Sequence, residues 1–286
     1  MSNGGLTVLM VHAHPDDEAF STGGTLARYA AEGVHTVLVC ATRGEVGEIH
    51  DPDLDPEEAK ERLAAIREEE LRRACAILNV SELHFLGYRD SGMVGTADND
   101  DPRNFHNADP DEAVGRVVRL IRQARPQVVV TYNERGGYGH PDHIAVHRAT
   151  VAAFDAAADA TRYPEQGLDP WQPSKLYYTA FPLSMLLRMI EMMRAQGIEQ
   201  PFGGDRDPAT FTVPDEVVTT RVDIGDYLEA KRESLRVHRT QLGVDNPILT
   251  MPQEVAREIM GHEAYQRVRS LVSAPDHEDD LFAGLR

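Results

Sequence analysis

The sequence predicts an α/β fold with a Rossmann-like, doubly wound and mostly parallel sheet. Over residues 6–181, short runs that are apolar throughout alternate with longer segments whose apolar residues recur at helical spacing. Such runs are typical of strands covered on both faces, and their alternation with helices favours crossovers that place helices on both sides of one sheet. Polar residues also follow directly after two of the runs, as expected where ligands gather beyond the carboxyl ends of strands.

Five strands and four helices are expected in this part of the chain. The strands cover residues 6–13, 34–42, 83–88, 126–133 and 175–181. The helices cover residues 22–32, 55–79, 110–125 and 140–160. Gly33 follows the first helix, as a C-terminal glycine often does, and Pro56 lies in the first turn of the second helix.

The pattern changes after residue 181. Residues 203–214 are rich in turn-forming types, whereas 224–240 and 252–271 each predict a helix. We therefore divide the chain into an α/β core at 1–181, which carries the site, and a mostly helical extension at 182–286. The extension is expected to belong to the same domain and to cap the site.

The composition excludes several classes of protein. Of the 286 residues, 41% are hydrophobic and 27% are charged, as in ordinary soluble globular proteins. The formal net charge is -18, so we expect no nucleic-acid partner and no binding to anionic membranes, because both require a basic surface. No basic-then-apolar leader precedes residue 6, and the protein is therefore expected in the cytoplasm.

Two further features bear on the compartment and the assembly. Cys40 and Cys75 lie in apolar segments without CxxC spacing, which indicates reduced core thiols rather than a disulfide. The apolar stretch at 185–193 predicts a core helix. An interface that forms a homo-oligomer is the alternative interpretation of that stretch.

Two clusters of metal-binding residue types follow the first and fourth expected strands. They are HPDD at 14–17 and HPDH at 140–143. Together they offer two histidines and one aspartate, a common ligand set for a catalytic zinc ion that keeps one position open for water. Fe²⁺, Co²⁺ and Mn²⁺ suit the same ligands. We therefore expect the two clusters to meet in one metal site.

The residues left over suit acid–base chemistry. Asp16 and Asp17 are neighbours whose side chains diverge in most backbone conformations, so one can bind the metal while the other takes a proton from metal-bound water. His140 could polarise a carbonyl oxygen or protonate a leaving amine, with Asp142 or another acceptor fixing its tautomer.

Two alternatives need no metal chemistry. His-Pro-Asp is also a common capping turn, because Asp favours N-caps and Pro favours the first helical turn. Gly23 and Gly24 could belong to a nucleotide loop, although the segment STGGTLA lacks GxGxxG spacing and follows an acidic turn. A catalytically silent protein that binds a metal or a nucleotide therefore remains the hypothesis from another class.

The two clusters and the segments between them resemble the PIG-L/LmbE-like family of zinc-dependent N-deacetylases. AHPDDE ends the first expected strand, GHPDH follows the fourth, and GEVGE and RDSGMVGT lie between them. The resemblance covers residues 6–181 and is strongest to members of the mycothiol pathway. It implies that His14, Asp17 and His143 are the zinc ligands and that Asp16 is the general base.

The resemblance also implies roles around the substrate. His140 would stabilise the oxyanion or act as an acid, Asp142 would orient it, and Tyr138 would swing over the substrate carbonyl. The residues implied in substrate binding are Arg67, Asp90, Met93, Ser21 and Glu48.

Three of these residues have simpler interpretations. Arg67 lies in the charged run REEELRR, which by itself favours a solvated helix face. Asp90 and Met93 could equally be turn and core residues.

The implied activity is metal-dependent removal of an acetyl group from a small molecule that contains N-acetylglucosamine, such as N-acetylglucosaminyl-inositol. The competing activity within the family is mycothiol S-conjugate amidase. Ser21 and Glu48 resemble the deacetylases, whereas the C-terminal third, with KRESLRVHRTQLG, looks more like amidase-type members. The resemblance therefore implies an amino-sugar substrate and mycothiol biosynthesis, and leaves the group attached to the glucosamine open.

Overall fold

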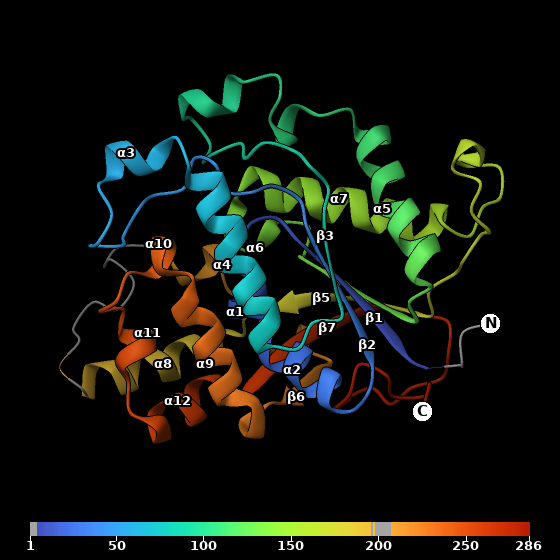
Figure 1. Cartoon of the computed structure of the whole chain (residues 1–286). Helices are drawn as coiled ribbons and strands as arrows, with labels where there is room; N and C mark the ends of the chain where they lie inside the picture. Colours follow the sequence, from blue (N-terminus) through green and yellow to red (C-terminus); the bar gives the residue numbers. More distant parts are fainter. Residues whose placement is uncertain (1–4, 196, 198–206) are drawn as a thin grey trace.

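The computed structural model of the chain describes residues 5–195, 197 and 207–286. Its sheet has seven strands in the order β3-β2-β1-β4-β5-β7-β6 (Figure 1). The strands are β1 (Thr7–His12), β2 (His35–Cys40), β3 (Glu82–Phe85), β4 (Val128–Thr131), β5 (Lys175–Ala180), β6 (Thr220–Asp223) and β7 (His262–Ser270). Strands β1 to β5 are parallel, and β7 runs antiparallel to both β5 and β6.

Helices cover both faces of this sheet. On one face, α2 (Gly23–Ala31) and α4 (Leu63–Ile77) pack over β1 and β2 in one hydrophobic cluster. On the other face, α5 (Pro110–Ala124) and α7 (Pro141–Ala156) pack against each other and over the same strands in a second cluster (Figure 1). The arrangement confirms the doubly wound architecture.

Further α-helices lie in the described part of the chain. They are α1 (Asp17–Ser21), α3 (Pro56–Lys60), α6 (Gly136–Gly139), α8 (Leu183–Ala195), α9 (Leu228–Val237), α10 (Arg239–Leu242), α11 (Pro247–Thr250) and α12 (Gln253–Met260). Helix α8 places Leu186, Met189 and Met193 in the first cluster, so this apolar stretch is at least partly core. Within the described residues, no helix has the length and apolar character needed to cross a membrane.

The five expected strands and the four expected helices between them are confirmed, with shifts at their ends. The helix expected at 55–79 is divided into α3 and α4, and the helix expected at 140–160 ends at Ala156. In the turn-rich segment, residues 203–206 lie outside the described residues, and a 3₁₀ helix spans Pro208–Thr210. The helix expected at 224–240 is present as α9 and α10 after a short 3₁₀ turn.

The helix expected at 252–271 is wrong in its second half. Helix α12 ends at Met260, and the chain continues as β7, which fills the gap between β5 and β6. Long-range contacts override the local spacing here, because β7 satisfies the backbone groups of both neighbouring strands. Glu263 also accepts the N–H groups of Gly24 and Thr25 at the start of α2. Strand β6 was not expected either.

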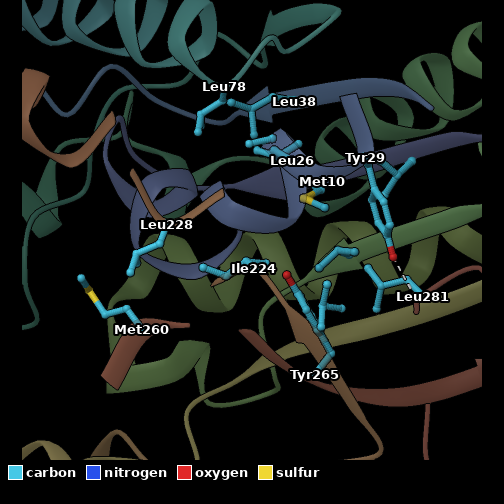
Figure 2. Close-up of a cluster of buried hydrophobic side chains, with 14 of the residues drawn as sticks. Met10, Leu26, Tyr29, Leu38, Leu78, Ile224, Leu228, Met260, Tyr265 and Leu281 are labelled. Atoms are coloured by element: carbon cyan, nitrogen blue, oxygen red, sulfur yellow. Dashed lines mark hydrogen bonds between the residues drawn. The ribbon is translucent and has the colours of Figure 1, made fainter. Parts of the chain in front are cut away.

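The last third of the chain shares its core with the first. Figure 2 shows side chains from both parts in one buried cluster, including Met10, Leu26, Leu38, Ile224, Leu228 and Tyr265. At one side of this cluster, the backbone N–H of Leu281 donates to the hydroxyl of Tyr29 at 2.8 Å. The region 182–286 therefore contributes two strands and several helices to the same sheet and core.

The topology also fixes where a site can form. Strand β1 pairs with β2 on one side and with β4 on the other, so the strand order reverses between β1 and β4. In open α/β sheets, ligands bind beyond the carboxyl ends of the strands at such a reversal. Both polar clusters of the sequence follow these two strands.

Candidate metal centre and active site

The first half of the site is a tight turn between β1 and α1. Every residue of β1 is buried, so the strand carries the turn on a rigid base. The backbone N–H of His14 donates to Asp17 Oδ2 at 2.8 Å, which folds the aspartate back over the histidine. Asp16, between them, has a positive φ of 132°. The Asp16 carboxylate faces Arg67 and the Asp17 carboxylate faces His14 and His143, so the two acids point to different sides, as the sequence predicts.

The second half opens helix α7 after β4. His140 is the N-cap residue, and its Nδ1 accepts the backbone N–H of Asp142 at 3.2 Å. Pro141 follows in the first turn, where a missing N–H costs nothing. His143 then points back from the helix toward His14, with 5.2 Å between their ring centroids. The capping interpretation is thus correct for His140, but it does not account for His143.

Side-chain atoms of His14, Asp17 and His143 lie close together where the two halves meet, and Asp17 faces the two histidines through different oxygens. His143 Nε2 lies 3.3 Å from His14 Nδ1 and 3.4 Å from Asp17 Oδ1, and His14 Nδ1 lies 3.5 Å from Asp17 Oδ2. Ligand atoms around a tetrahedral zinc ion are separated by about 3.3–3.5 Å. The three side chains are of types that zinc binds, and Asp17 would offer one of its two oxygens to an ion shared with His14 and His143.

Asp142 acts on the other nitrogen of His14. Its Oδ2 lies 3.0 Å from His14 Nε2 but 4.0 Å from His140 Nδ1. Ser91 donates its backbone N–H and its hydroxyl to the same carboxylate, which is fully buried. A proton on His14 Nε2 leaves the Nδ1 lone pair free for a metal, and a carboxylate partner is the usual way to fix that tautomer.

A second grouping replaces Asp17 with His140. The ligand atoms of His14, His140 and His143 lie within 4.8 Å of one another, as do those of His14, Asp90, His140 and Asp142. However, His140 Nδ1 already accepts the N–H of Asp142, so neutral His140 carries its proton on Nε2. That nitrogen is then a hydrogen-bond donor rather than a metal ligand. Burial, followed by the nearby His14 and His143, lowers the pKa of His140 to about 4, which keeps it neutral.

Buried carboxylates surround His14 and make the site negative. Asp17, Asp90 and Asp142 lie 3.5, 3.6 and 3.0 Å from its ring nitrogens. Burial alone would lower the pKa of His14, but these carboxylates raise it well above its ordinary value. Burial alone would raise the pKa of Asp17, but His143 and His14 hold it well below its usual range. A bound cation would balance this excess of negative charge.

Asp16 is the carboxylate that stays outside the ligand triangle. Burial raises its pKa to about 6, although Arg67 beside it acts in the opposite direction. Arg67 Nη2 lies 3.3 Å from Asp16 Oδ2 and donates to the carbonyl of Pro15 at 2.7 Å. Arg67 is only 3% exposed, so its interpretation as a solvated helix face is wrong.

The GEVGE segment makes room for that arginine. Arg67 Nη1 donates to the carbonyl of Gly44 at 3.0 Å. A Cβ atom on Gly44 would lie 2.1 Å from the guanidinium, and one on Gly47 would lie 2.5 Å from it. Glycine at these two positions leaves the space that the guanidinium of Arg67 occupies.

The other residues expected at the substrate lie at different depths. Asp90 is buried beside His14, whereas Met93 is 45% exposed. Ser21 lines the pocket described below, and the Glu48 side chain is largely exposed and pairs with His50 at 3.1 Å. Their part in substrate binding remains a prediction.

A pocket of about 570 Å³ opens beside the metal-facing atoms. Asp17, His143 and Tyr138 line one part of it. The ring of Tyr138 lies 4.9 Å from that of His143, and its side chain is half exposed at this edge. The remainder of the wall is largely apolar and includes Phe20, Met185, Phe211, Leu235, Ile248 and Ile259.

Sequence reasoning missed Tyr132 and Ser91. The hydroxyl of Tyr132 donates to Asp17 Oδ2 and accepts the backbone N–H of Ala13, both at 2.8 Å. Its ring also stacks on His143, with centroids 4.2 Å apart. The available signal for Tyr132 was its hydroxyl directly after a strand that begins with three valines, since such a position lies at the carboxyl edge of the sheet.

Known proteins resemble this chain over most of its length. Residues 9–154 match the model of the PIG-L family, described as GlcNAc-PI de-N-acetylase. A 1D-myo-inositol 2-acetamido-2-deoxy-alpha-D-glucopyranoside deacetylase from Geodermatophilus obscurus is 46% identical over 97% of both chains. The chain belongs to the PIG-L family.

Solved structures support the fold of this PIG-L protein. The N,N'-diacetylchitobiose deacetylase from Pyrococcus horikoshii has a TM-score of 0.64 at 22% identity, covering 93% of this chain and 85% of its own. GalB, a 4-carboxy-2-hydroxymuconate hydratase from Pseudomonas putida, has a TM-score of 0.62 at 19% identity, covering 94% and 99%. A deacetylase and a hydratase thus share the fold, so the activity must be argued from the site.

Proposed function

We propose that this protein hydrolyses the acetamide of N-acetylglucosaminyl-inositol and releases acetate and the free amine. The observation that carries the proposal is the meeting of His14, Asp17 and His143 at distances of 3.3–3.5 Å, with the separate carboxylate of Asp16 beside them. The name of the 46% identical relative from Geodermatophilus obscurus supports this choice of substrate.

The metal is proposed to be Zn²⁺, held by His14 Nδ1, Asp17 and His143 Nε2. When bound there, it supplies a water of lowered pKa and an electrophilic centre for the carbonyl oxygen. Asp142 keeps the proton of His14 on Nε2, and Tyr132 occupies Asp17 Oδ2, which leaves Oδ1 facing His143. His14 Nδ1, Asp17 Oδ1 and His143 Nε2 would thus each offer one lone pair to the ion.

Asp16 is the proposed general base. Arg67 contacts the Asp16 carboxylate through one nitrogen, Nη2, which lies 3.3 Å from Oδ2. This single contact orients the carboxylate and is weaker than a bidentate ion pair. The carboxylate takes a proton as water attacks the amide carbon, and that proton is then available for the leaving nitrogen as the C–N bond breaks.

His140 and Tyr138 are proposed to stabilise charge on the former carbonyl oxygen. His140 presents Nε2–H as a donor because its Nδ1 is occupied by the backbone of Asp142. A fixed donor of this kind stabilises developing negative charge without reorganising during the reaction. Tyr138, half exposed at the pocket edge, can bring its hydroxyl over the same position.

The base assignment is tested by Asp16→Ala. We expect acetate release from N-acetylglucosaminyl-inositol to fall by about 10²–10⁴-fold, the usual contribution of a general base. Metal analysis of the same variant should still show one equivalent of bound metal, because Asp16 is not a proposed ligand. Acetate release at a near wild-type rate would refute the assignment.

The metal assignment is tested by removing and restoring the ion. We expect a chelator to abolish hydrolysis and to lower the unfolding temperature, since a ligand that binds the folded state stabilises it. Zn²⁺, Fe²⁺, Co²⁺ and Mn²⁺ are then added back separately, because the same ligands suit all four. A protein that binds no metal and hydrolyses the substrate would exclude this mechanism.

A second candidate function is hydrolysis of a larger amide, as in a mycothiol S-conjugate amidase. The observation that favours it is the largely apolar pocket beside Asp17 and His143, whose volume of about 570 Å³ is larger than an acetyl group requires. Rates on the acetyl sugar and on a thioether-conjugate amide, measured side by side, discriminate between the two. A higher kcat/KM on the conjugate would favour the amidase.

The same proposal includes the cellular setting. We propose a cytoplasmic enzyme of mycothiol biosynthesis whose partner is the amino-sugar substrate itself. Whether copies of the chain also associate is measured by light scattering of the purified protein.

A further inference from the structure

The turn that carries the proposed base contains a conformation that L-residues rarely adopt. Asp16 has φ 132° and ψ −30°, far from the allowed regions for a residue with a side chain. Strained residues persist at functional sites only where the surrounding structure over-determines them. Contacts from outside the turn must therefore hold Asp16 in place.

Glu18 holds the backbone N–H of Asp16, while the Asp16 carbonyl accepts the N–H groups of Ala19 and Phe20. Glu18 Oε2 accepts the Asp16 N–H at 3.0 Å, and the Glu18 side chain is 1% exposed. A carboxylate has two oxygens joined rigidly to one carbon, so whatever fixes Oε1 also fixes Oε2. The position of Asp16 thus depends on the partner of the second oxygen.

His238 is that partner and comes from the last third of the chain. Its Nε2 lies 2.7 Å from Glu18 Oε1, and its side chain is fully buried. Its Nδ1 is buried without a hydrogen-bond partner among the described residues. An unpaired buried nitrogen costs free energy that an apolar side chain would avoid. The bond to Glu18 is therefore the interaction for which an imidazole is needed here.

Neighbouring residues hold the His238 segment against the same region. Thr240 donates its N–H and its hydroxyl to the carboxylate of Glu70, at 2.9 and 2.6 Å, and its carbonyl accepts the N–H of His50 at 2.7 Å. Lys231 lies about two helix turns before His238. Its Nζ donates to the carbonyl of Phe20 at 2.8 Å. Helix α9 and its C-terminal end thus contact both ends of α1.

We propose that His238 is a positioning residue for Asp16. It holds Glu18, and through Glu18 it holds the Asp16 backbone in the arrangement that directs the carboxylate toward the reacting water. The proposal rests on the proposed function, because it assumes that Asp16 acts as the base. It assigns to the region 182–286 a direct part in the geometry of the reaction.

The first test compares two substitutions at this position. His238→Leu removes the bond to Glu18 and should lower kcat roughly ten- to hundredfold, the scale expected when a catalytic group is misplaced. KM should change by less than about twofold, and the metal content should not change. His238→Gln keeps an N–H donor near the position of Nε2 and should restore most of kcat. Equal losses in both variants would overturn the proposal.

A remote variant controls for general loss of stability. Tyr177→Phe removes a buried hydrogen bond to Glu278, 2.7 Å long, at a different part of the sheet. It should lower the unfolding temperature without lowering kcat. If Tyr177→Phe lowered kcat as much as His238→Leu, the effect at His238 would be one of stability and the proposal would fail.

A double-mutant cycle tests whether His238 acts through Asp16. In the Asp16→Ala background, His238→Leu should cause no further loss of the residual rate, because the group that it positions is gone. Losses that multiply would show that His238 acts independently of Asp16 and would overturn the proposal.

A last measurement needs no substrate. Hydrogen exchange in a peptide spanning residues 13–20 should be faster in His238→Leu than in the wild-type chain and near wild type in His238→Gln, because the Asp16 N–H loses its fixed acceptor. If the wild-type chain releases no acetate, the proposed function fails while this measurement still decides the structural link. Unchanged exchange in His238→Leu would overturn that link.

Discussion

At the scale of single residues, the site depends on a buried carboxylate behind the metal-facing side chains. Asp142 is fully buried and joins His14 to Ser91, with 3.0 Å between its Oδ2 and His14 Nε2. It sets which nitrogen of His14 carries a proton and so which one can bind a metal. Its sequence position beside His140 suggested a different partner, and only the fold shows that the partner is His14.

The role of Asp142 leads to a prediction about metal affinity. Asp142→Asn replaces one accepting oxygen with an amide N–H₂ that faces the donors of Ser91 and His14. We expect the dissociation constant for Zn²⁺ to rise by about 10–100-fold, the usual effect of losing a carboxylate that supports a metal-bound histidine. Competition with a chromophoric chelator measures it. Asp155→Asn, on the exposed side of the same helix, should leave the affinity unchanged.

At the scale of elements, the packing of α2 joins the two ends of the chain. Glu263 of β7 accepts the N–H groups of Gly24 and Thr25 at 2.9 and 2.8 Å, which satisfies the free donors at the start of the helix. Ile224 packs directly against Gly24, where a Cβ atom would lie 2.6 Å from it. The last third of the chain is therefore needed to complete an early helix.

This close contact predicts opposite outcomes for two adjacent glycines. Gly24→Ala should lower the free energy of unfolding by about 1–3 kcal/mol, because the added methyl overpacks the contact with Ile224. Gly23→Ala should leave it unchanged or raise it slightly, since its nearest neighbour would be 3.4 Å away and alanine favours helix. Urea unfolding of both variants measures the difference. Equal destabilisation would contradict the packing argument.

At the scale of the whole molecule, a buried ion pair ties the C-terminal tail to the sheet. Lys175 Nζ lies 2.5 Å from Glu278 Oε1, and both side chains are fully buried. Tyr177 and Thr220 donate to the other oxygen of Glu278, so the carboxylate connects β5, β6 and the tail. Burial would raise the pKa of Glu278, but these partners, Lys175 first, lower it below its ordinary value.

The lowered pKa of Glu278 predicts how stability depends on pH. Its contribution is fully present above the unfolded pKa and is lost as the pH falls through the lower, folded pKa. At neutral pH, Glu278→Gln should cost about 3–5 kcal/mol, because it leaves Lys175 buried without a charged partner. The difference from wild type should shrink in acid. Denaturant unfolding at neutral and acidic pH measures it.

A surface pair provides the control for that measurement. Glu69 and Arg73 lie 3.0 Å apart on α4, and both side chains are more than half exposed. Glu69→Gln should change the free energy of unfolding by less than about 1 kcal/mol at any pH. A pH-independent cost for Glu278→Gln would show that the carboxylate acts through packing rather than charge.

The sequence by itself determined the elements that local chemistry specifies. Continuous apolar runs predicted the five parallel strands, because a strand buried on both faces needs apolar residues at successive positions. Apolar residues at helical spacing predicted the helices between them. The two HPD clusters at the ends of β1 and β4 predicted one shared metal site, and the family resemblance implied His14, Asp17 and His143 as its ligands. These three side chains lie close together in the structure. The positions of the two motifs are enough for this prediction, because β1 and β4 are neighbouring parallel strands and their carboxyl ends lie side by side.

Only the tertiary structure decided what depends on partners far along the chain. The segment 262–270 has apolar residues at helical spacing, yet it forms β7 because open backbone groups of β5 and β6 lie on either side of it. Arg67 lies in a charged helix but is buried, because Gly44 and Gly47 leave space for it. The bond between His238 and Glu18 spans 220 residues. Local sequence does not encode such contacts, because they arise when distant segments are packed into one core.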